Sequence, residues 1–244
     1  MYDSSKADLR INGSGSAAGG NYNVVKISGT GKISGDILCS EFHISGSGEA
    51  NGNVESDSFK INGSGNVKGN LKSQEIKVNG SANFYGDISC NNITISGSSD
   101  IAKNLDAQMV KINGSAKIVG DCNTEKFHSC GEFEIGGLLN ADDIYVELYW
   151  SRSHVKEIGG ENIRVMRGPN RHGVLKFLGL LGVHSPSLET DSIEGDEIYL
   201  ENTTAKVVRG NNVTIGTGCS IGLVEYKGVY EKSGDTKVTE ERKI

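Results

Sequence analysis

Apolar residues recur along residues 9–146 at spacings that fit no helical period. Within each repeat they stand at offsets 0, 6, 10, 15 and 17, and the residue at offset 17 opens the next repeat. One repeat runs through Ile61, Val67, Leu71 and Ile76 before Val78 begins another. One polar residue separates the positions at offsets 15 and 17, which is the alternation of a half-buried strand. The pattern therefore predicts short strands joined by turns.

Glycines punctuate the same repeat. One glycine follows an Asn or Ser in each repeat, with a first step of 16 residues and later steps of 17. A corner of the chain needs either positive φ or a backbone without Cβ, and glycine provides both. We therefore expect a corner at each member of this set: Gly13, Gly29, Gly46, Gly63, Gly80, Gly97 and Gly114.

A repeat of this length is too short to hold a helix and a strand, and it cannot bury its inward face alone. Stacked copies can do so, with like residues above one another in columns. We predict an all-β fold, a single-stranded parallel β-helix (β-solenoid) with coils of about 17 residues and about 12 coils in total. Parallel crossover connections favour a right-handed coil.

The register divides the chain into four parts. Residues 1–8 form a short N-terminal tail, and residues 9–146 form the regular β-helix repeats. Residues 147–226 continue as irregular coils with an insertion at 166–190. Residues 227–244 are rich in charge, and we expect them to be a disordered C-terminal tail.

Composition narrows the function classes. The net charge of −6 disfavours nucleic acid as a partner. The first residues contain no apolar signal-peptide core, and no apolar run is long enough to span a bilayer, so we expect a cytoplasmic protein. Two of the five cysteines, Cys39 and Cys90, fall in a column of small residues, where we expect packing and no disulfide.

Motifs of catalysis or metal binding are weak. Gly218–Gly222 reads GCSIG, but a nucleophile elbow needs a strand, a turn and a helix, and Ser220 lies between two strand positions. Cys122, His128 and Cys130 lack a second pair of ligands at zinc spacing. A hexapeptide-repeat acyltransferase would need apolar residues at six-residue steps and a catalytic histidine. We therefore predict no enzyme activity, no cofactor and no metal.

The segment from Met166 to Pro186 interrupts the repeat with basic and apolar residues. Two interpretations stay open: a loop that folds back over one face of the solenoid, and a contact site for a membrane surface or a protein partner. The candidate contact residues are Arg167, Arg171, Lys176, Phe177, Leu178 and Leu181.

The repeats KISGTGKISGD, KINGSGNVKGN and KVNGSANFYGD resemble those of the bactofilins, bacterial cytoskeletal proteins built on a right-handed parallel β-helix. The resemblance covers about residues 9–146. It implies a scaffold for cell shape, motility or envelope-associated partners, which polymerises end to end without nucleotide through its terminal coils. The residues of the N-terminal coil would be Leu9, Ile11, Ala17, Val25 and Ile27, and those of the C-terminal coil Val213, Ile215, Ile221 and Val224.

A capped, monomeric β-solenoid that acts as a binding or regulatory module is the alternative. A solenoid without caps leaves strand edges and core residues open, which invites another chain to continue the stack. No capping sequence is evident before Leu9. The first eight residues, MYDSSKAD, differ from the apolar membrane anchor of many bactofilins, so membrane association would come through a partner or through residues 166–186.

Overall fold

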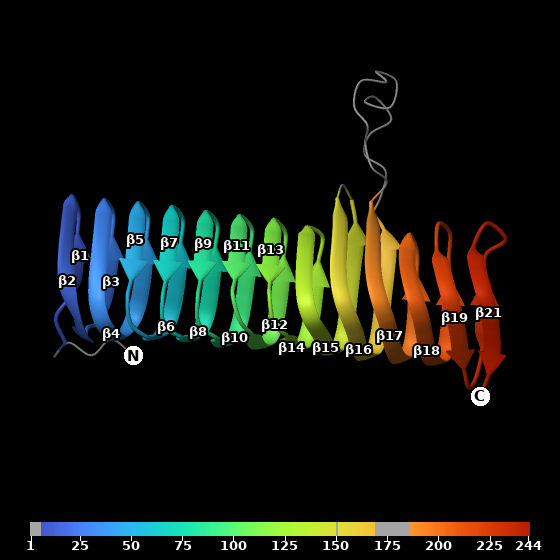
Figure 1. The fold of residues 1–244 in the computed structure, drawn as a ribbon. Coiled ribbons are helices and arrows are strands. Elements are labelled where there is room, and N and C mark those ends of the chain that lie inside the picture. The colour runs from blue at the N-terminus through green and yellow to red at the C-terminus, as the bar shows by residue number, and fades with distance from the viewer. Residues whose placement is uncertain (1–5, 150, 169–185) are drawn as a thin grey trace, which may run out of the picture. The chain divides into compact units, whose positions relative to one another are not determined.

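The computed structural model describes residues 6–149, 151–168 and 186–244, and every regular element in these ranges is a β-strand (Figure 1). The strands pair in parallel, each with the corresponding strand of the neighbouring coil. The predicted all-β parallel β-solenoid is therefore confirmed, with about 13 coils where we expected about 12. The right hand of the coil stays a prediction. The chain divides into two compact units, Met1–Glu125 and Lys126–Ile244.

Unit 1 repeats one simple coil. A longer strand, a glycine corner, a short strand and a second turn return the chain to the start of the next coil. The first two coils contain β1 (Leu9–Ile11), β2 (Ser14–Asn21), β3 (Val24–Ile27) and β4 (Thr30–Ile44). The later ones contain β5 (Ser47–Ala50), β6 (Val54–Ile61), β7 (Ser64–Val67), β8 (Leu71–Val78), β9 (Ser81–Phe84), β10 (Ile88–Ile95), β11 (Ser98–Ile101), β12 (Leu105–Ile112) and β13 (Ser115–Ile118). The boundary between the units falls within β14 (Cys122–Ser129).

The core of unit 1 consists of columns of apolar side chains. Phe42 lies between Val25 and Phe59 in the strand register, and the rings of Phe42 and Phe59 stack with their centroids 5.0 Å apart. Since every coil contributes the same positions, each side chain buries itself against its counterparts above and below. Six successive members of one column are all buried: Val25, Phe42, Phe59, Ile76, Ile93 and Val110.

Glycine is required at the corner because successive coils approach closely there. A Cβ built on Gly63 would lie 2.0 Å from the carbonyl oxygen of Gly46. Gly63 does not have a left-handed φ, so of the two reasons considered for these glycines the missing Cβ is the one that applies. Gly13 belongs to the same column in the first coil, and a Cβ there would meet nothing within 4 Å.

The second turn is held by a ladder of Asn and Asp side chains. The backbone N–H of Asn70 donates to Oδ1 of Asn53 at 2.9 Å, and the N–H of Asp87 donates to Oδ1 of Asn70 at 3.0 Å. The same bond joins Asn53 to Asp36 and Asp121 to Asn104. Each side chain thus satisfies a turn amide of the next coil, where no strand partner is available.

Unit 2 has several longer strands and coils of less regular length. Its strands are β15 (Glu132–Leu148), β16 (Arg152–Arg167), β17 (Ser187–Leu200), β18 (Thr203–Ile215), β19 (Ser220–Tyr226), β20 (Tyr230–Lys232) and β21 (Lys237–Lys243). β16 pairs with β17 in parallel, and Arg152 aligns with Ser187, so β17 continues the stack next to β16. In unit 1, Cys39 and Cys90 were expected to pack in a column of small residues without forming a disulfide. This expectation is confirmed, since both are buried free thiols.

The expectation of a disordered C-terminal tail is wrong. β20 pairs with β18, and β21 pairs with β19, both in parallel. Residues 230–243 therefore form a further coil of the solenoid, although their side chains are mostly charged. Backbone hydrogen bonds of the strand ladder hold this coil, and these bonds do not require apolar side chains.

We predict that Gly63→Ala destabilises the protein by about 1–3 kcal/mol, because the new methyl group would overlap the backbone of the preceding coil. Chemical denaturation followed by circular dichroism measures the change. Gly13→Ala is the matched control, in the same column without a preceding coil, and it should leave the free energy of unfolding within about 0.5 kcal/mol of the parent. Equal destabilisation by both substitutions would contradict the close-approach explanation.

Candidate assembly interface

The first coil of unit 1 presents an open strand edge. β1 pairs with β3, and β2 pairs with β4. Within the described ranges, no strand pairs with the other side of β1 or β2. Backbone N–H and C=O groups on such an edge can bind another strand. This edge is therefore a candidate site for a second chain.

Apolar side chains accompany this edge. Leu9 and Ala17 are half-buried, and Ile11 is 8% exposed. Three of the five residues predicted for the N-terminal interface thus lie in the outermost coil. Val25 and Ile27 do not, because β1 covers them and both are fully buried.

The fourth core position of the first coil contains no apolar side chain. Gly20 aligns with Ile37 of the next coil. The ring of Tyr22 lies within 3.5 Å of the place where a Cβ of Gly20 would be, and its hydroxyl donates to the carbonyl of Ala18 at 3.0 Å. The ring of Tyr22 therefore covers this position from the side. None of the four core positions of the first coil has a charged residue.

Charged groups lie on the outer surface beside this coil. Arg10 donates to Asp8 at 2.8 Å, and the hydrogen bond lowers the pKa of the Asp8 carboxyl below its usual value. Asn23 donates to the same carboxylate at 3.4 Å. These contacts join the residues before β1 to the first coil.

The residues predicted for the C-terminal interface do not lie in the outermost coil. β20 covers Val213 and Ile215, and β21 covers Ile221 and Val224. All four side chains are buried. The expectation that they form the end of the solenoid is therefore wrong, because residues 230–243 add the coil described above.

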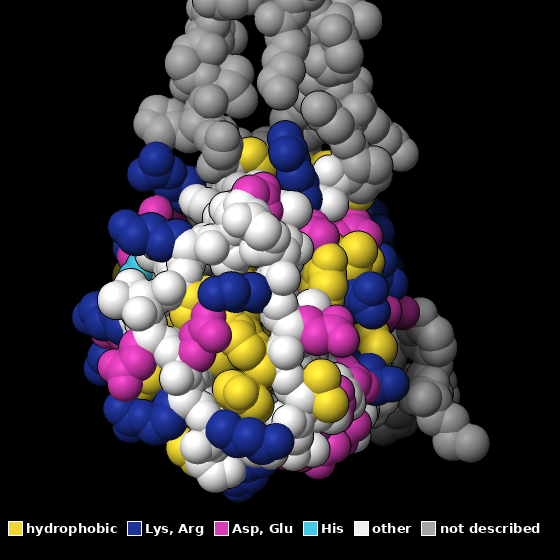
Figure 2. Space-filling model, turned by 90° about the vertical axis from the view of Figure 1, so that its right-hand side faces the viewer, with side chains coloured by type: hydrophobic (Ala, Val, Ile, Leu, Met, Phe, Trp, Pro, Cys, Tyr) yellow, Lys and Arg dark blue, Asp and Glu magenta, His cyan; other side chains and the backbone are white. Residues whose placement is uncertain are grey.

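That added coil, β20 with β21, has a polar composition at its core positions. Tyr230 aligns with Val213, Lys232 with Ile215, and Glu241 with Val224. Lys232 and Glu241 form an ion pair with each other, and the Tyr230 hydroxyl donates to Glu241 at 3.2 Å. Figure 2, which looks onto the side where β21 lies, shows charged side chains of both signs among the apolar ones.

A ladder of opposite charges fixes β21 to the coils before it. Glu225 accepts from Arg209 at 2.6 Å and from Arg242 at 3.0 Å. The hydrogen bond from Arg209, with the positive charges of both arginines, lowers the pKa of Glu225 below its usual value. Arg242 also donates to Glu240 at 2.6 Å. The order Arg209, Glu225, Arg242 runs across three neighbouring strands, β18, β19 and β21.

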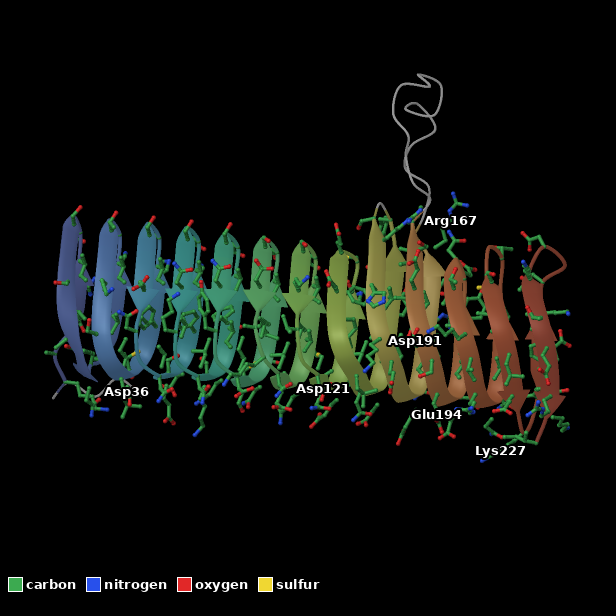
Figure 3. The ribbon with its side chains drawn as sticks, viewed as in Figure 1. Asp36, Asp121, Arg167, Asp191, Glu194 and Lys227 are labelled. Atoms are coloured by element: carbon green, nitrogen blue, oxygen red, sulfur yellow. The ribbon has the colours of Figure 1, made fainter. Side chains whose placement is uncertain are left out.

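Of the residues predicted to contact a partner or a membrane, Arg167 alone can be located. It ends β16 with an exposed side chain, and its backbone N–H donates to Glu201 at 2.8 Å (Figure 3). The other members, Arg171, Lys176, Phe177, Leu178 and Leu181, lie outside the described residues, so their role stays a prediction. Within the described ranges, no helix has the length and apolar character needed to cross a membrane.

The weak catalytic and metal motifs gain no support from their surroundings. Ser220 begins β19, a parallel strand without the helix that a nucleophile elbow needs. Burial raises the pKa of Cys39 and Cys90 to about 12 and that of Cys219 to about 11, so these thiols stay protonated at neutral pH. In the part of the chain that the structure describes, no three His, Cys, Asp or Glu residues come together to bind a metal ion.

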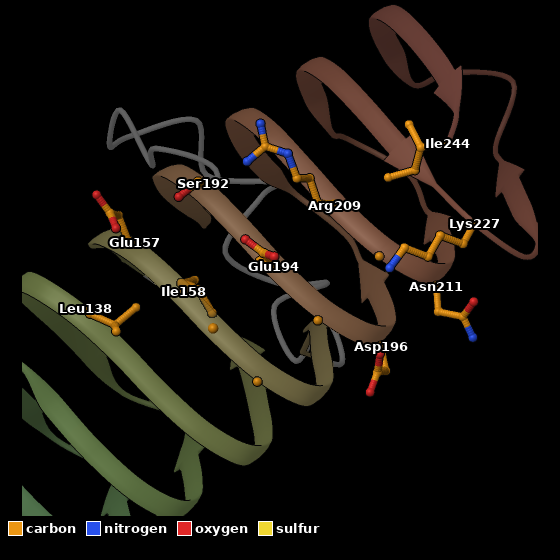
Figure 4. Close-up of a pocket in the computed structure, with 14 residues that line it drawn as sticks. Leu138, Glu157, Ile158, Ser192, Glu194, Asp196, Arg209, Asn211, Lys227 and Ile244 are labelled. Atoms are coloured by element: carbon orange, nitrogen blue, oxygen red, sulfur yellow. The ribbon is translucent and has the colours of Figure 1, made fainter.

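A groove in unit 2 was missed by the sequence reasoning. Charged side chains, among them Glu194 and Lys227, line it together with Leu138 (Figure 4). Its floor lacks side chains because glycines align there across neighbouring coils, and a Cβ on Gly195 would lie 2.5 Å from the carbonyl oxygen of Gly160. Glycines at equivalent positions of successive coils were the signal: Gly160, Gly195 and Gly210.

Comparisons with known proteins agree with the repeat architecture. A family model described as Bactofilin, polymer-forming cytoskeletal, matches residues 3–88 and 61–140. Among curated proteins, the uncharacterized protein YhbF of Bacillus subtilis (strain 168) is 43% identical over 108 residues, which is 44% of this chain and 42% of the relative. The uncharacterized protein YhbE of the same organism is 45% identical over 97 residues, 40% of this chain and 39% of the relative. The matched region spans about two fifths of each relative, and no solved structure matches.

We predict that the carboxyl group of Glu241 titrates below its ordinary value of 4.5, because the hydrogen bond from Lys232 stabilises the carboxylate. A group whose pKa is lowered by folding stabilises the folded state above its ordinary pKa, and this contribution is lost as pH falls through the lowered value. Carbon-detected NMR titration of Glu-labelled protein measures the midpoint. In Lys232→Met the midpoint should move up toward 4.5, and an unchanged midpoint would contradict the pairing.

Proposed function

The chain belongs to the bactofilin family of polymer-forming cytoskeletal proteins, and we propose on that basis that it is a non-enzymatic scaffold that self-assembles end to end through its N-terminal coil. The observation that carries this proposal is the open edge of β1 and β2. In the other coils of unit 1, the corresponding strand edge and apolar positions contact the preceding coil. In the first coil of the described range, the same edge and positions have no such contact. A second copy would pair the edge and remove the half-buried Leu9 and Ala17 from water, beside Ile11, which is already buried.

Assembly in this proposal requires no nucleotide. Gly29–Gly35 reads GTGKISG and is superficially similar to a phosphate-binding loop. Most of it lies in β4, a strand, whereas a phosphate loop opens a helix whose N-terminus faces the phosphates. The free energy of association would come instead from strand pairing and apolar burial.

The polar outer surface of the coils would serve as the scaffold's display surface. In unit 1, Asn79 donates to Asn62 at 2.8 Å, and Asn62 contacts His43 at 3.0 Å, in a ladder along successive coils. Such ladders would present polar groups at regular spacing along the surface, and partner proteins would bind to these groups. We propose a cytoplasmic scaffold for proteins of cell shape, motility or the envelope, with membrane contact through a partner or through residues 166–186.

A second candidate is the capped, monomeric binding module. The ion pair of Lys232 and Glu241 at core positions of the last coil favours it, because a polar outer coil is typical of a capped solenoid. The N-terminal coil, which has no charge at the corresponding positions, favours self-assembly. The mass of the protein in solution separates the two candidates.

We predict that the parent protein exceeds the monomer mass of 25.9 kDa at high concentration without nucleotide, whereas Leu9→Lys/Ile11→Lys remains a monomer. The lysines would place two charges in the interface that the proposal assigns to the first coil. Light scattering coupled to gel filtration measures the mass. The control Ser89→Lys/Asn92→Lys adds the same charge to exposed, outward positions of β10, a strand that is paired on both sides, and should assemble like the parent. A parent that is monomeric at every concentration would contradict self-assembly.

A further inference from the structure

We propose that the coil formed by β20 and β21 is a polar cap, which prevents apolar stacking on unit 2 and limits copies of this chain to pairs joined by their N-terminal coils. The N-terminal half of this statement rests on the proposed function. The cap itself is inferred from independent features of the last coil. It limits the number of copies in one assembly, which the family description, polymer-forming, does not specify.

The first feature is the change of residue type at the core columns. In β18 and β19 these positions hold Val213, Ile215, Ile221 and Val224, all buried. One coil later the aligned residues are Tyr230, Lys232, Val238 and Glu241. Two of the four apolar columns thus end in charged residues of opposite sign, so this coil covers the core beneath it without offering an equivalent apolar face above.

The second feature is the way these charges are arranged. Lys232 and Glu241 come from different strands of the same coil and pair with each other, with Tyr230 as a third member. Their side chains remain 44% and 36% exposed, so water solvates the pair. Another copy stacked on this coil would remove that water, and desolvation of two ions opposes the contact. In its present position the pair costs little, because it stays at the surface.

The third feature is the strand edge of the cap. β20 has three residues, and β21 contains Lys237, Glu240, Glu241, Arg242 and Lys243 within seven. Short edge strands and charged side chains are the means by which proteins prevent edge-to-edge pairing. Arg242 joins β21 to β19 through its bond to Glu225, so the charged edge is part of the ordered coil.

The first coil of unit 1 differs in the residue types at its core positions and in the length and charge of β2, whereas β1, like β20, has three residues and includes a charged one, Arg10. Its four core positions are Leu9, Ile11, Ala17 and Gly20, none of them charged. β2 is an eight-residue strand without a charged residue. Of the two outermost coils in the described ranges, the first is therefore the one whose core positions favour apolar association. Two copies that use it cover it completely, and growth beyond the pair would require burial of the Lys232–Glu241 ion pair.

The test restores the apolar columns. Lys232→Ile/Glu241→Val gives the last coil the residue types of Ile215 and Val224 one coil earlier. The parent should have twice the mass of the chain, about 52 kDa from the 25.9 kDa of one copy. The uncapped variant should grow with concentration into assemblies of at least tenfold the chain mass, visible as filaments by negative-stain electron microscopy.

The matched control is Glu189→Val/Lys206→Ile, which makes the same kinds of substitution at exposed, outward positions of β17 and β18, strands paired on both sides, and should remain a pair. If the uncapped variant fails to fold, the near-isosteric Lys232→Met/Glu241→Gln removes both charges with less change of shape. Its mass should likewise rise above that of the pair.

Combination with Leu9→Lys/Ile11→Lys separates the cap from the proposed function. That double variant should be monomeric, and adding the uncapping substitutions should give pairs through the C-terminal coil. Were the parent monomeric, N-terminal association would fail, yet pairing of the uncapped chain alone would still support the cap. Filaments of the parent, or an uncapped and folded chain whose mass equals that of the parent, would overturn the cap.

Discussion

Parallel pairing of equivalent strands in neighbouring coils is the interaction on which the rest of this structure depends. Along its strands each coil donates and accepts backbone hydrogen bonds, so in the regular coils a strand residue lies above its counterpart one coil earlier. This geometry makes side-chain choices collective. Phe42 stacks on Phe59, and the side chain of Asn53 accepts a hydrogen bond from the turn of the next coil. The corner of the preceding coil leaves no space for a Cβ on Gly63.

The same constraint makes the outermost coils the chemically distinctive ones. A coil inside the stack has both edges paired, whereas an outermost coil has one edge and one apolar face to satisfy. The first coil leaves Leu9 and Ile11 beside an unpaired edge, and the last coil replaces two apolar columns by Lys232 and Glu241. The assembly that we propose for this chain therefore depends on a few residues of the outermost coils and little on the repeats between them.

Sequence reasoning succeeded where the period is visible in the apolar residues. The spacing of Ile61, Val67, Leu71 and Ile76 predicted the buried columns, because only a stacked coil explains those offsets. It failed at residues 227–244, since charged residues at core positions hide the period and resemble a tail. It also assigned Val25 and Ile27 to the outermost coil, whereas β1 pairs with them from outside. A strand of three residues such as β1 gives too short a sequence pattern to predict that pairing. The ion pair and the glycine-floored groove depend on which coils are neighbours, and irregular coil lengths in unit 2 conceal that.

Hydrogen–deuterium exchange of the parent chain at low and high protein concentration tests the account most directly, because it reports on each edge separately. The account predicts that amides of β1 and β2 exchange more slowly as concentration rises, since a second copy covers that edge. Exchange in β20 and β21 should be the same at both concentrations. Slowing in β20 and β21, or exchange in β1 and β2 that does not depend on concentration, would contradict an open first coil and a capped last coil.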